Sequence, residues 1–484
     1  MRRLSRLATL LAMTAAAGCS FDPHYVRPEL PVPPSWPVGD AYLRQTEAAL
    51  PSVSYRDVFR DARLQAIIDR ALVNNRDLRV ALANIVAARA QYRIQRADLF
   101  PQVDASGGYT RSGASTVSNS AARGGNAFDL TGGVSAFQVD LFGRVRSLTR
   151  AAQDQYFAQE ASARATRLTL VAEIATDWLQ YAADESLLDV ARQTVRSAGI
   201  TVRLTQARLQ GGIAPRTDVA QAITVLATAQ ADLAQQTTLV AQDANALQLL
   251  VGAPVDPALL PRDLGEAMPN VASLPAGLDS TILLRRPDVV QSEYLLRASN
   301  AEIGAARASL FPTISLTAVA GLASTALTSL FTGGAFNYSA GPSASYPIFR
   351  AGAARAGVAY ARAERDVALA SYERTIQTAF REVGDALARR GTIADQLAAQ
   401  QRNLAAATDA FNLASARYRG GIDPFLNTLD AQRTLYTTQR TVVSTQLIAV
   451  QNLVTLYQVL GGDSTLDAAA GGPALVAGQA TPPR

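Results

Sequence analysis

The chain has 484 residues, of which 18% are charged and 6% aromatic, and its formal net charge is +5. It contains no lysine, one histidine and one cysteine, which excludes a Schiff-base lysine, a phosphate-binding loop with its lysine, and a zinc site built from His and Cys. The weak basic charge is dispersed along the chain and is typical of solvated helix faces, so nucleic acid is not an expected partner.

A leader occupies the first part of the chain. Three arginines, at positions 2, 3 and 6, precede a mostly apolar run over 7–17 that is too short to span a bilayer as a helix. The sequence Ala16-Ala17-Gly18-Cys19 then resembles a bacterial lipobox. The resemblance implies a signal peptide over 1–18 and acylation of Cys19, and Ser20 favours the outer membrane. The open alternative is a soluble periplasmic protein with a free cysteine.

The remaining chain is an internal duplication. Leu99-Phe100-Pro101 recurs as Leu310-Phe311-Pro312, and Gly211-Gly212-Ile213 recurs as Gly420-Gly421-Ile422. The offset is 311 − 100 = 211 for the first motif and 420 − 211 = 209 for the second. We therefore divide the chain as follows: a lipid-anchored N-terminal segment 19–57, a first repeat 58–252, a linker 253–277, a second repeat 278–461, and a tail 462–484 that we expect to be disordered.

Each repeat is expected to contain three helices. In the first repeat they are predicted over 58–98, 144–210 and from about Pro215 to 251; in the second repeat they are predicted over 287–309, 352–419 and 424–460. Glycine pairs end the long helices, Asp423 is the expected N-cap of the last helix, and Pro424 its first residue. A helix over 144–210 would be roughly 100 Å long, so it must project and pack lengthwise against others.

Four segments show strand periodicity. Apolar and polar residues alternate over 102–110, 128–136, 313–322 and 336–346. Strands of about ten residues with one apolar face match transmembrane β-strands, although an amphipathic hairpin on a soluble core has the same pattern. Four strands cannot close a barrel, and open edges are not tolerated in lipid. The membrane interpretation therefore requires several copies, and three copies would supply twelve strands around a polar lumen.

These motifs together resemble the TolC-like outer membrane efflux protein family, in particular its lipoprotein branch, which serves resistance-nodulation-division pumps. The resemblance covers nearly the whole chain. Its most specific stretch is Leu283-Leu284-Arg285-Arg286-Pro287-Asp288, continuing through Asn300 to Ala308 and on to Phe311-Pro312. Also similar to the family are Asp140-Leu141-Phe142-Gly143-Arg144 and Ala416 to Ile422 with Leu429-Asp430-Ala431.

The resemblance implies a mainly α fold with transmembrane β. A trimeric, twelve-stranded barrel with four strands per chain would continue into a long periplasmic α-helical barrel with an equatorial mixed region. The implied partners are two further copies of the chain, outer membrane lipid, a periplasmic adaptor (membrane fusion protein) and an inner-membrane pump, with no cofactor and no metal. The implied function is passive conduction of small toxic compounds. Metal-ion efflux and type I protein secretion stay open, as does a trimeric coiled-coil adhesin with a solid core.

The resemblance also assigns residues to the turns that follow the long helices. Its adaptor-docking motif falls on Arg208, Gly211, Gly212, Arg417, Gly420 and Gly421. The alternative is that these glycines only supply positive φ at helix ends. Asp430 matches an aspartate that lines the periplasmic constriction in family members. Further gate candidates are Asn427, the first-repeat equivalents Asp218 and Gln221, and Tyr418, Arg419 and Asp423.

Overall fold

The structure is a computed structural model that describes residues 21–37, 54–113, 125–272 and 279–463. The predicted signal peptide over 1–18, Cys19 and the tail from Ser464 onward lie outside the described residues. The described chain divides into two compact units. The strand unit comprises the described residues within 1–29, 85–159 and 292–372, and the hairpin unit comprises those within 30–84, 160–291 and 373–484.

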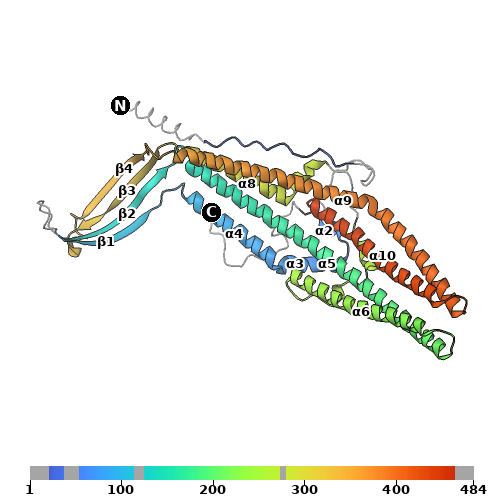
Figure 1. Ribbon diagram of the computed structural model, residues 1–484. Coiled ribbons are helices and arrows are strands. Elements are labelled where there is room, and N and C mark those ends of the chain that lie inside the picture. The colour runs from blue at the N-terminus through green and yellow to red at the C-terminus, as the bar shows by residue number, and fades with distance from the viewer. Residues whose placement is uncertain (1–20, 38–53, 114–124, 273–278, 464–484) are drawn as a thin grey trace. The chain divides into compact units, whose positions relative to one another are not determined.

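The strand unit contains one antiparallel sheet. Its strands are β1 (Asp104–Ser112), β2 (Gly125–Val139), β3 (Thr313–Ser324) and β4 (Phe336–Ser345), in the order β1-β2-β3-β4 (Figure 1). The central β2–β3 pairing joins the two repeats and runs from Phe128↔Ser324 to Val139↔Ile314. A β-bulge between Val134 and Phe137 shifts this register, with Ala136 at φ 56°. All four predicted strands are confirmed, and β1 and β4 form the unpaired edges.

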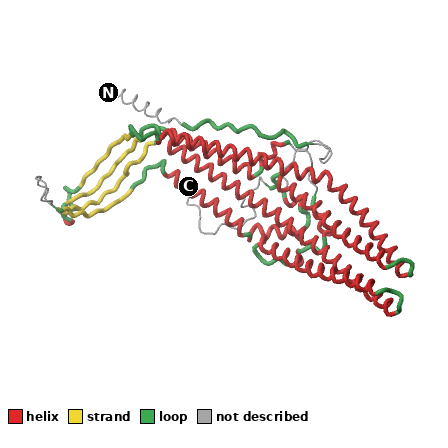
Figure 2. Tube along the Cα trace, in the orientation of Figure 1, coloured by secondary structure: helices red, strands yellow, loops and turns green. Residues whose placement is uncertain are grey.

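Two helical hairpins dominate the hairpin unit. The helix α5 (Arg144–Gln210) is followed by α6 (Arg216–Val251), and α9 (Ala353–Arg419) is followed by α10 (Phe425–Val459) (Figure 2). The residues of α5 and α9 begin in the strand unit and end in the hairpin unit. Both α5 and α9 have 67 residues, and the predicted bounds of all four helices are confirmed to within one residue. Duplication has therefore kept the length of each hairpin.

Shorter helices complete the fold. They are α2 (Tyr55–Val58), α3 (Ala62–Asn74), α4 (Arg76–Ala97), α7 (Leu264–Ala267) and α8 (Pro287–Ala308), with 3-10 turns at 257–259, 268–270, 280–285 and 327–329. The prediction of one helix over 58–98 is wrong, because the helix breaks at Asn75. The Asn75 side chain accepts from the backbone N–H of Leu78 at 2.8 Å and donates to the carbonyl of Leu250 at 2.8 Å. This cap ends α3 and starts α4.

The core of the hairpin unit contains large aromatic side chains. Trp178 is fully buried, and its indole N–H donates to the carbonyl of Leu259 at 3.1 Å. Phe59 and Tyr457 meet edge to face at 5.3 Å, and the Tyr457 hydroxyl donates to Asp463 at 3.0 Å. These contacts pack the linker and both chain ends of the unit against the long helices.

Neither a spanning helix nor a metal cluster is found in the part of the chain that the structure describes. None of its helices combines the length and apolarity needed to cross a bilayer. Nor do its His, Asp and Glu side chains gather into a group of three or more that could hold a metal ion.

Candidate functional site

The turns after α5 and α9 have the same backbone geometry. The N–H of Ile213 bonds to the carbonyl of Arg208 at 2.9 Å, and Ile422 bonds to Arg417 in the same way at 2.9 Å. The second glycine of each pair is left-handed, with φ 75° at Gly212 and 73° at Gly421. These bonds form Schellman motifs, in which such a glycine satisfies carbonyls at a helix end. The requirement for positive φ therefore holds for the second glycine of each pair, and not for Gly211 or Gly420.

The predicted cap of the last helix is wrong. The helix α10 begins at Phe425 with Pro424 at the N-cap position, and the Asp423 carboxylate does not cap it. Asp423 instead accepts from Arg417, from Nε at 2.6 Å and from Nη2 at 3.0 Å. A forked, charged donor outcompetes a backbone N–H for this carboxylate. The Arg417 side chain, helped by a hydrogen bond from Asn427, holds the pKa of Asp423 below its usual value.

Arg208 occupies the equivalent position in the first turn, but its contacts differ. The residue equivalent to Asp423 is Ala214 (423 − 209 = 214), so Arg208 has no acidic partner within its own turn. Its guanidinium lies over the ring of Tyr418, 4.4 Å from the centroid, and its Nη2 donates to the carbonyl of Arg419 at 3.1 Å. Arg208 therefore joins the first hairpin to the second.

An apolar cluster lies behind these contacts. The Tyr418 and Phe425 rings are 5.3 Å apart, and both are almost fully buried. The cluster draws on both hairpins, and its members are Val202, Ala222, Tyr418, Phe425 and Leu429. Tyr418, predicted as a gate residue, is thus part of the packing that holds the two hairpins together.

The other gate candidates lie on different kinds of surface. Asn427 and Asp430 are exposed and one helical turn apart on α10, while Phe425 and Leu429 on the same helix are buried. The first-repeat equivalents, Asp218 and Gln221, are half-buried on α6. Burial raises the pKa of Asp218. Among the gate candidates on α6 and α10, Asn427 and Asp430 therefore present the exposed polar face.

A second polar contact joins the two hairpins, and the sequence analysis did not predict it. The Tyr436 hydroxyl of α10 donates to Asp232 Oδ2 of α6 at 2.7 Å, and Arg440 Nη1 lies 3.7 Å from the same oxygen. Burial, reinforced by Asp232, raises the pKa of Tyr436 to about 12. The partners are 204 residues apart, so no local spacing signals them. The only sequence sign is the i, i+4 placement of Tyr436 and Arg440.

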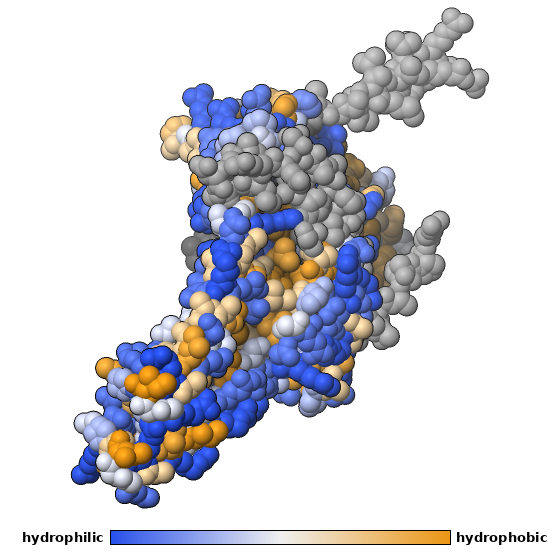
Figure 3. Space-filling view, turned by 90° about the vertical axis from the view of Figure 1, so that its right-hand side faces the viewer, coloured by the Kyte–Doolittle hydropathy of each residue, from blue (hydrophilic) through white to orange (hydrophobic). Residues whose placement is uncertain are grey.

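Each turn also carries exposed apolar side chains. Ile213 is 74% exposed and Ile422 is 66% exposed, and Leu426 at the start of α10 is 51% exposed. Figure 3, which views the molecule from the side of the helical turns, shows apolar surface between hydrophilic patches there. A partner that binds the turns would meet a mixed surface of arginine and isoleucine.

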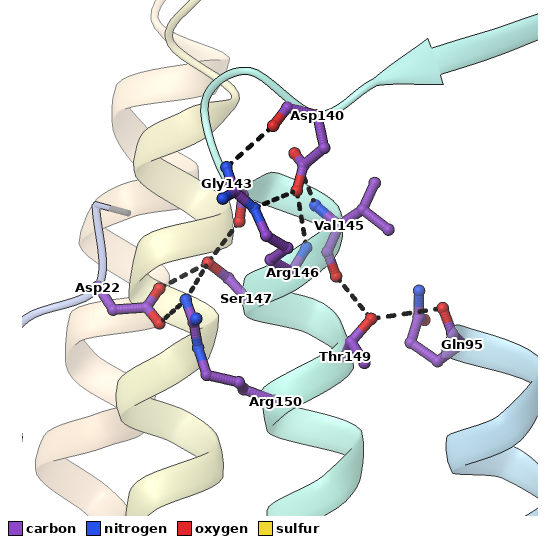
Figure 4. Close-up of polar contacts among 9 residues, drawn as sticks. All are labelled: Asp22, Gln95, Asp140, Gly143, Val145, Arg146, Ser147, Thr149 and Arg150. Atoms are coloured by element: carbon purple, nitrogen blue, oxygen red, sulfur yellow. Dashed lines mark hydrogen bonds and ion pairs between the residues drawn. The ribbon is translucent and has the colours of Figure 1, made fainter. Parts of the chain in front are cut away.

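Phe21 and Asp22, which follow Cys19 closely, bind to α5 and α8 within the strand unit. Asp22 accepts from the Ser147 hydroxyl at 2.6 Å and forms an ion pair with Arg150 (Figure 4). Arg307 donates to the carbonyl of Phe21 at 3.0 Å. A side chain at Gly304 would collide with Asp22, so glycine is what lets the segment lie this close to α8.

The motif Asp140 to Arg144 forms the start of α5 beside this segment. The Asp140 carboxylate accepts from the backbone N–H groups of Val145 at 3.1 Å and Arg146 at 2.9 Å (Figure 4). Gly143, between the two, has a left-handed backbone with φ 73°.

Three aromatic rings stack beside this cap. The Phe142 ring stacks on the Phe311 ring with centroids 4.9 Å apart, and the Phe21 ring also stacks on the Phe311 ring, at 4.8 Å. The motif therefore caps a helix and anchors the N-terminal segment.

Comparison with known proteins identifies the family. A model described as outer membrane efflux protein matches residues 67–253 and again 278–462. The chain belongs to the outer membrane efflux protein family. The two matched stretches correspond to one match in each repeat, as expected for a duplicated chain.

Relatives and solved structures agree with this membership. The chain is 43% identical to the probable efflux pump outer membrane protein TtgC of Pseudomonas putida over 93% of this chain and 94% of that protein. It is 39% identical to the outer membrane protein OprJ of Pseudomonas aeruginosa, covering 94% and 95%. A membrane protein structure from Pseudomonas aeruginosa matches with TM-score 0.85 and 37% identity over 92% of this chain and 98% of that one.

A further structural match is the open state of the Neisseria gonorrhoeae MtrE outer membrane channel, with TM-score 0.81 and 32% identity over 92% of this chain and 98% of that chain. The predicted fold class is confirmed: a mainly helical, duplicated chain of the outer membrane channel type with four strands per copy. The protein is a transport channel of the outer membrane and not an enzyme.

Proposed function

We propose that this protein is the outer membrane channel of a tripartite efflux pump and that it passively conducts small toxic compounds. The support for this cargo is the naming of its relatives. A toluene efflux pump outer membrane protein and an antibiotic efflux pump outer membrane protein, both from Pseudomonas putida, are each 43% identical to the chain. A solvent efflux pump outer membrane protein is 41% identical.

Three copies form the conducting unit. The single observation that carries this step is the open four-stranded sheet, with β1 and β4 as unpaired edges. Edges cannot face lipid, so the sheet must close with sheets from other copies, and three copies give a twelve-stranded barrel. The hairpins of the three copies continue the tunnel through the periplasm, and the region around 253–277 belongs to its equatorial girdle.

The N-terminus carries a lipid anchor on Cys19. Support comes from the lipobox-like residues before it and from the firm attachment of Phe21 and Asp22 to α5 and α8. Only Ser20 lies between Cys19 and Phe21, so acyl chains on Cys19 would be attached within about 8 Å of Phe21. The anchor would thus act close to the helix starts that adjoin the strands.

The turns after α5 and α9 dock a periplasmic adaptor, which joins the channel to an inner-membrane pump that supplies the energy. Arg208 and Arg417 contribute charge, and the glycine pairs shape the turns. The exposed Ile213 and Ile422 add apolar contact area. Asp430, with Asn427 beside it, lines the periplasmic constriction and sets its cation preference.

The gate assignment predicts a change in conductance. Asp430→Ala removes a ring of three carboxylates from the constriction, so single-channel conductance in planar bilayers should rise and cation preference should fall. Asp409→Ala, at an exposed position on α9, is the matched control and should leave both unchanged. If the trimer conducts but Asp430→Ala behaves like the control, the gate assignment is wrong and the channel assignment stands. A purified protein that forms no conducting trimer would overturn the channel itself.

The docking assignment predicts a loss of adaptor binding. Arg417→Glu reverses the charge at the second turn, so crosslinking of the channel to its adaptor in cells should fall several-fold while the trimer persists. Arg402→Glu is the control, because Arg402 is exposed on the same helix but lies 15 residues before Arg417 (417 − 402 = 15). Undiminished crosslinking in Arg417→Glu would rule out the docking role.

A further inference from the structure

Two aromatic side chains mark the place where the two repeats meet in the strand unit. Phe142 lies in the connection from β2 to α5, and Phe311 lies in the connection from α8 to β3. Their rings are stacked with centroids 4.9 Å apart and planes at 19°. The stack accompanies the pairing of β2 with β3, which brings the second strand of one repeat beside the first strand of the next.

The duplicated counterparts of this pair have no such stacking partner among the residues that the structure describes. Phe349 lies in the connection from β4 to α9, and Phe100 lies in the connection from α4 to β1. Phe349 is 86% exposed and Phe100 is 61% exposed, whereas Phe311 in the formed stack is 38% exposed. Ile348, next to Phe349, is 94% exposed. These three side chains are apolar and lie next to the two unpaired edges of the sheet.

The internal duplication indicates which molecule covers these exposed side chains. Within the chain, the second strand of repeat one pairs with the first strand of repeat two. The same succession continues only if the second strand of repeat two, β4, pairs with the first strand of repeat one, β1, of another copy. The connection that holds Phe349 then meets the connection that holds Phe100. The β2–β3 junction is therefore a template for the junction between copies.

We propose that Phe349 of one copy stacks on Phe100 of the next copy, with Ile348 beside the pair, so that the partner of this surface is a second copy of this chain. The proposal rests on the trimeric channel proposed above and names contacts that hold it together. Stacked aromatic rings prefer centroid separations of about 4.5–7 Å, which the intrachain template satisfies. The N-terminal segment adds Phe21 to the intrachain stack alone, because each chain has one N-terminus and two such junctions.

Site-directed crosslinking tests the contact. Outer membranes from cells that express the full-length Phe100→Cys/Phe349→Cys chain are treated with a short bis-maleimide, and the products are separated on a denaturing gel. We expect covalent dimers and trimers from the double variant. The single variants should give none, which also controls for Cys19. The matched control is Phe311→Cys/Phe349→Cys, because Phe311 is the counterpart of Phe100 but lies at an edge already paired within its own chain.

Each outcome decides the proposal. Trimers seen by native mass spectrometry without crosslinks from Phe100→Cys/Phe349→Cys, or equal crosslinking in the control, would overturn the contact and leave the trimeric channel intact. That result would instead make the exposed rings lipid-facing. Failure to form any trimer in the unmodified chain would overturn the proposed channel as well. As a second readout, Phe349→Ala should lower the temperature at which the trimer dissociates, and Phe349→Tyr should not; equal temperatures for both would also overturn the contact.

Discussion

The two helical hairpins have the same backbone and different side-chain contacts. Their turn glycines correspond at an offset of 209 (421 − 212), as do their closing glycines (461 − 252), and all four take positive φ. Yet Arg417 is paired within its own turn, whereas Arg208 reaches the carbonyl of Arg419 in the other hairpin. Duplication thus preserved the geometry that glycine dictates, and divergence at one position, Ala214 against Asp423, redirected an arginine from a local contact to a link between hairpins.

The hairpins also differ farther from their turns. Asp184 on α5 lies beside Asp243 on α6, and Asp184 is only 4% exposed. The equivalent residues of the second hairpin, at 184 + 209 and 243 + 209, are Ile393 and Asn452, which carry no charge. Asn452 is buried and donates to the carbonyl of Ala386 at 3.2 Å. The first hairpin therefore has a pair of acidic side chains that responds to pH, whereas the second hairpin has uncharged residues at the equivalent positions.

The largest expected effect concerns the cluster that joins the hairpins. Phe425→Ala removes a ring that is 1% exposed and packs on Tyr418, so it should lower the local free energy of unfolding by about 3–5 kcal/mol. Hydrogen exchange at the ends of α9 and α10 would measure the loss. The equivalent residue in the first hairpin is the exposed Arg216, and Arg216→Ala should change exchange little. Similar effects of the two substitutions would mean that the two turns are packed alike.

The second prediction concerns the acidic pair. Burial, followed by the neighbouring Asp184 and Asp177, raises the pKa of Asp243 from 3.8 to about 7. Because the folded state favours the protonated form, the folded protein loses stability as the pH rises from about 4 to about 7. Asp243→Asn should therefore be more stable than the unmodified protein at pH 8, by about 1–2 kcal/mol after allowing for its partial exposure, and no different at pH 4.

Thermal unfolding in detergent between pH 4 and pH 8 would measure this difference. The matched variant is Asn452→Asp in the second hairpin, which places an acid at the equivalent buried position. It should lose stability with rising pH, as the first hairpin does. A stability difference for Asp243→Asn that does not depend on pH would contradict the linkage to protonation.

Local sequence signals predicted the elements well and the contacts between them poorly. Alternation identified all four strands, and glycine pairs fixed the ends of α5 and α9, because these signals act within a few residues. The Asp423-Pro424 pair suggested a helix cap, but an arginine six residues earlier competed successfully for the carboxylate. The links from Arg208 to Arg419 and from Tyr436 to Asp232 join residues more than 200 positions apart, so only the fold could bring them together.

The smallest expected effect distinguishes the two arginines. Arg208→Gln removes a cation from the Tyr418 ring and a donor from the Arg419 carbonyl, at a cost of about 0.5–1 kcal/mol for an exposed cation–π contact. Because the contact joins two hairpins, hydrogen exchange should become about two- to fivefold faster at both turns. Arg417→Gln breaks a pair within one turn, so only the second turn should exchange faster. If Arg208→Gln affected the first turn alone, the contact between the hairpins would contribute no stability, and the two turns would differ in side-chain contacts without differing in stability.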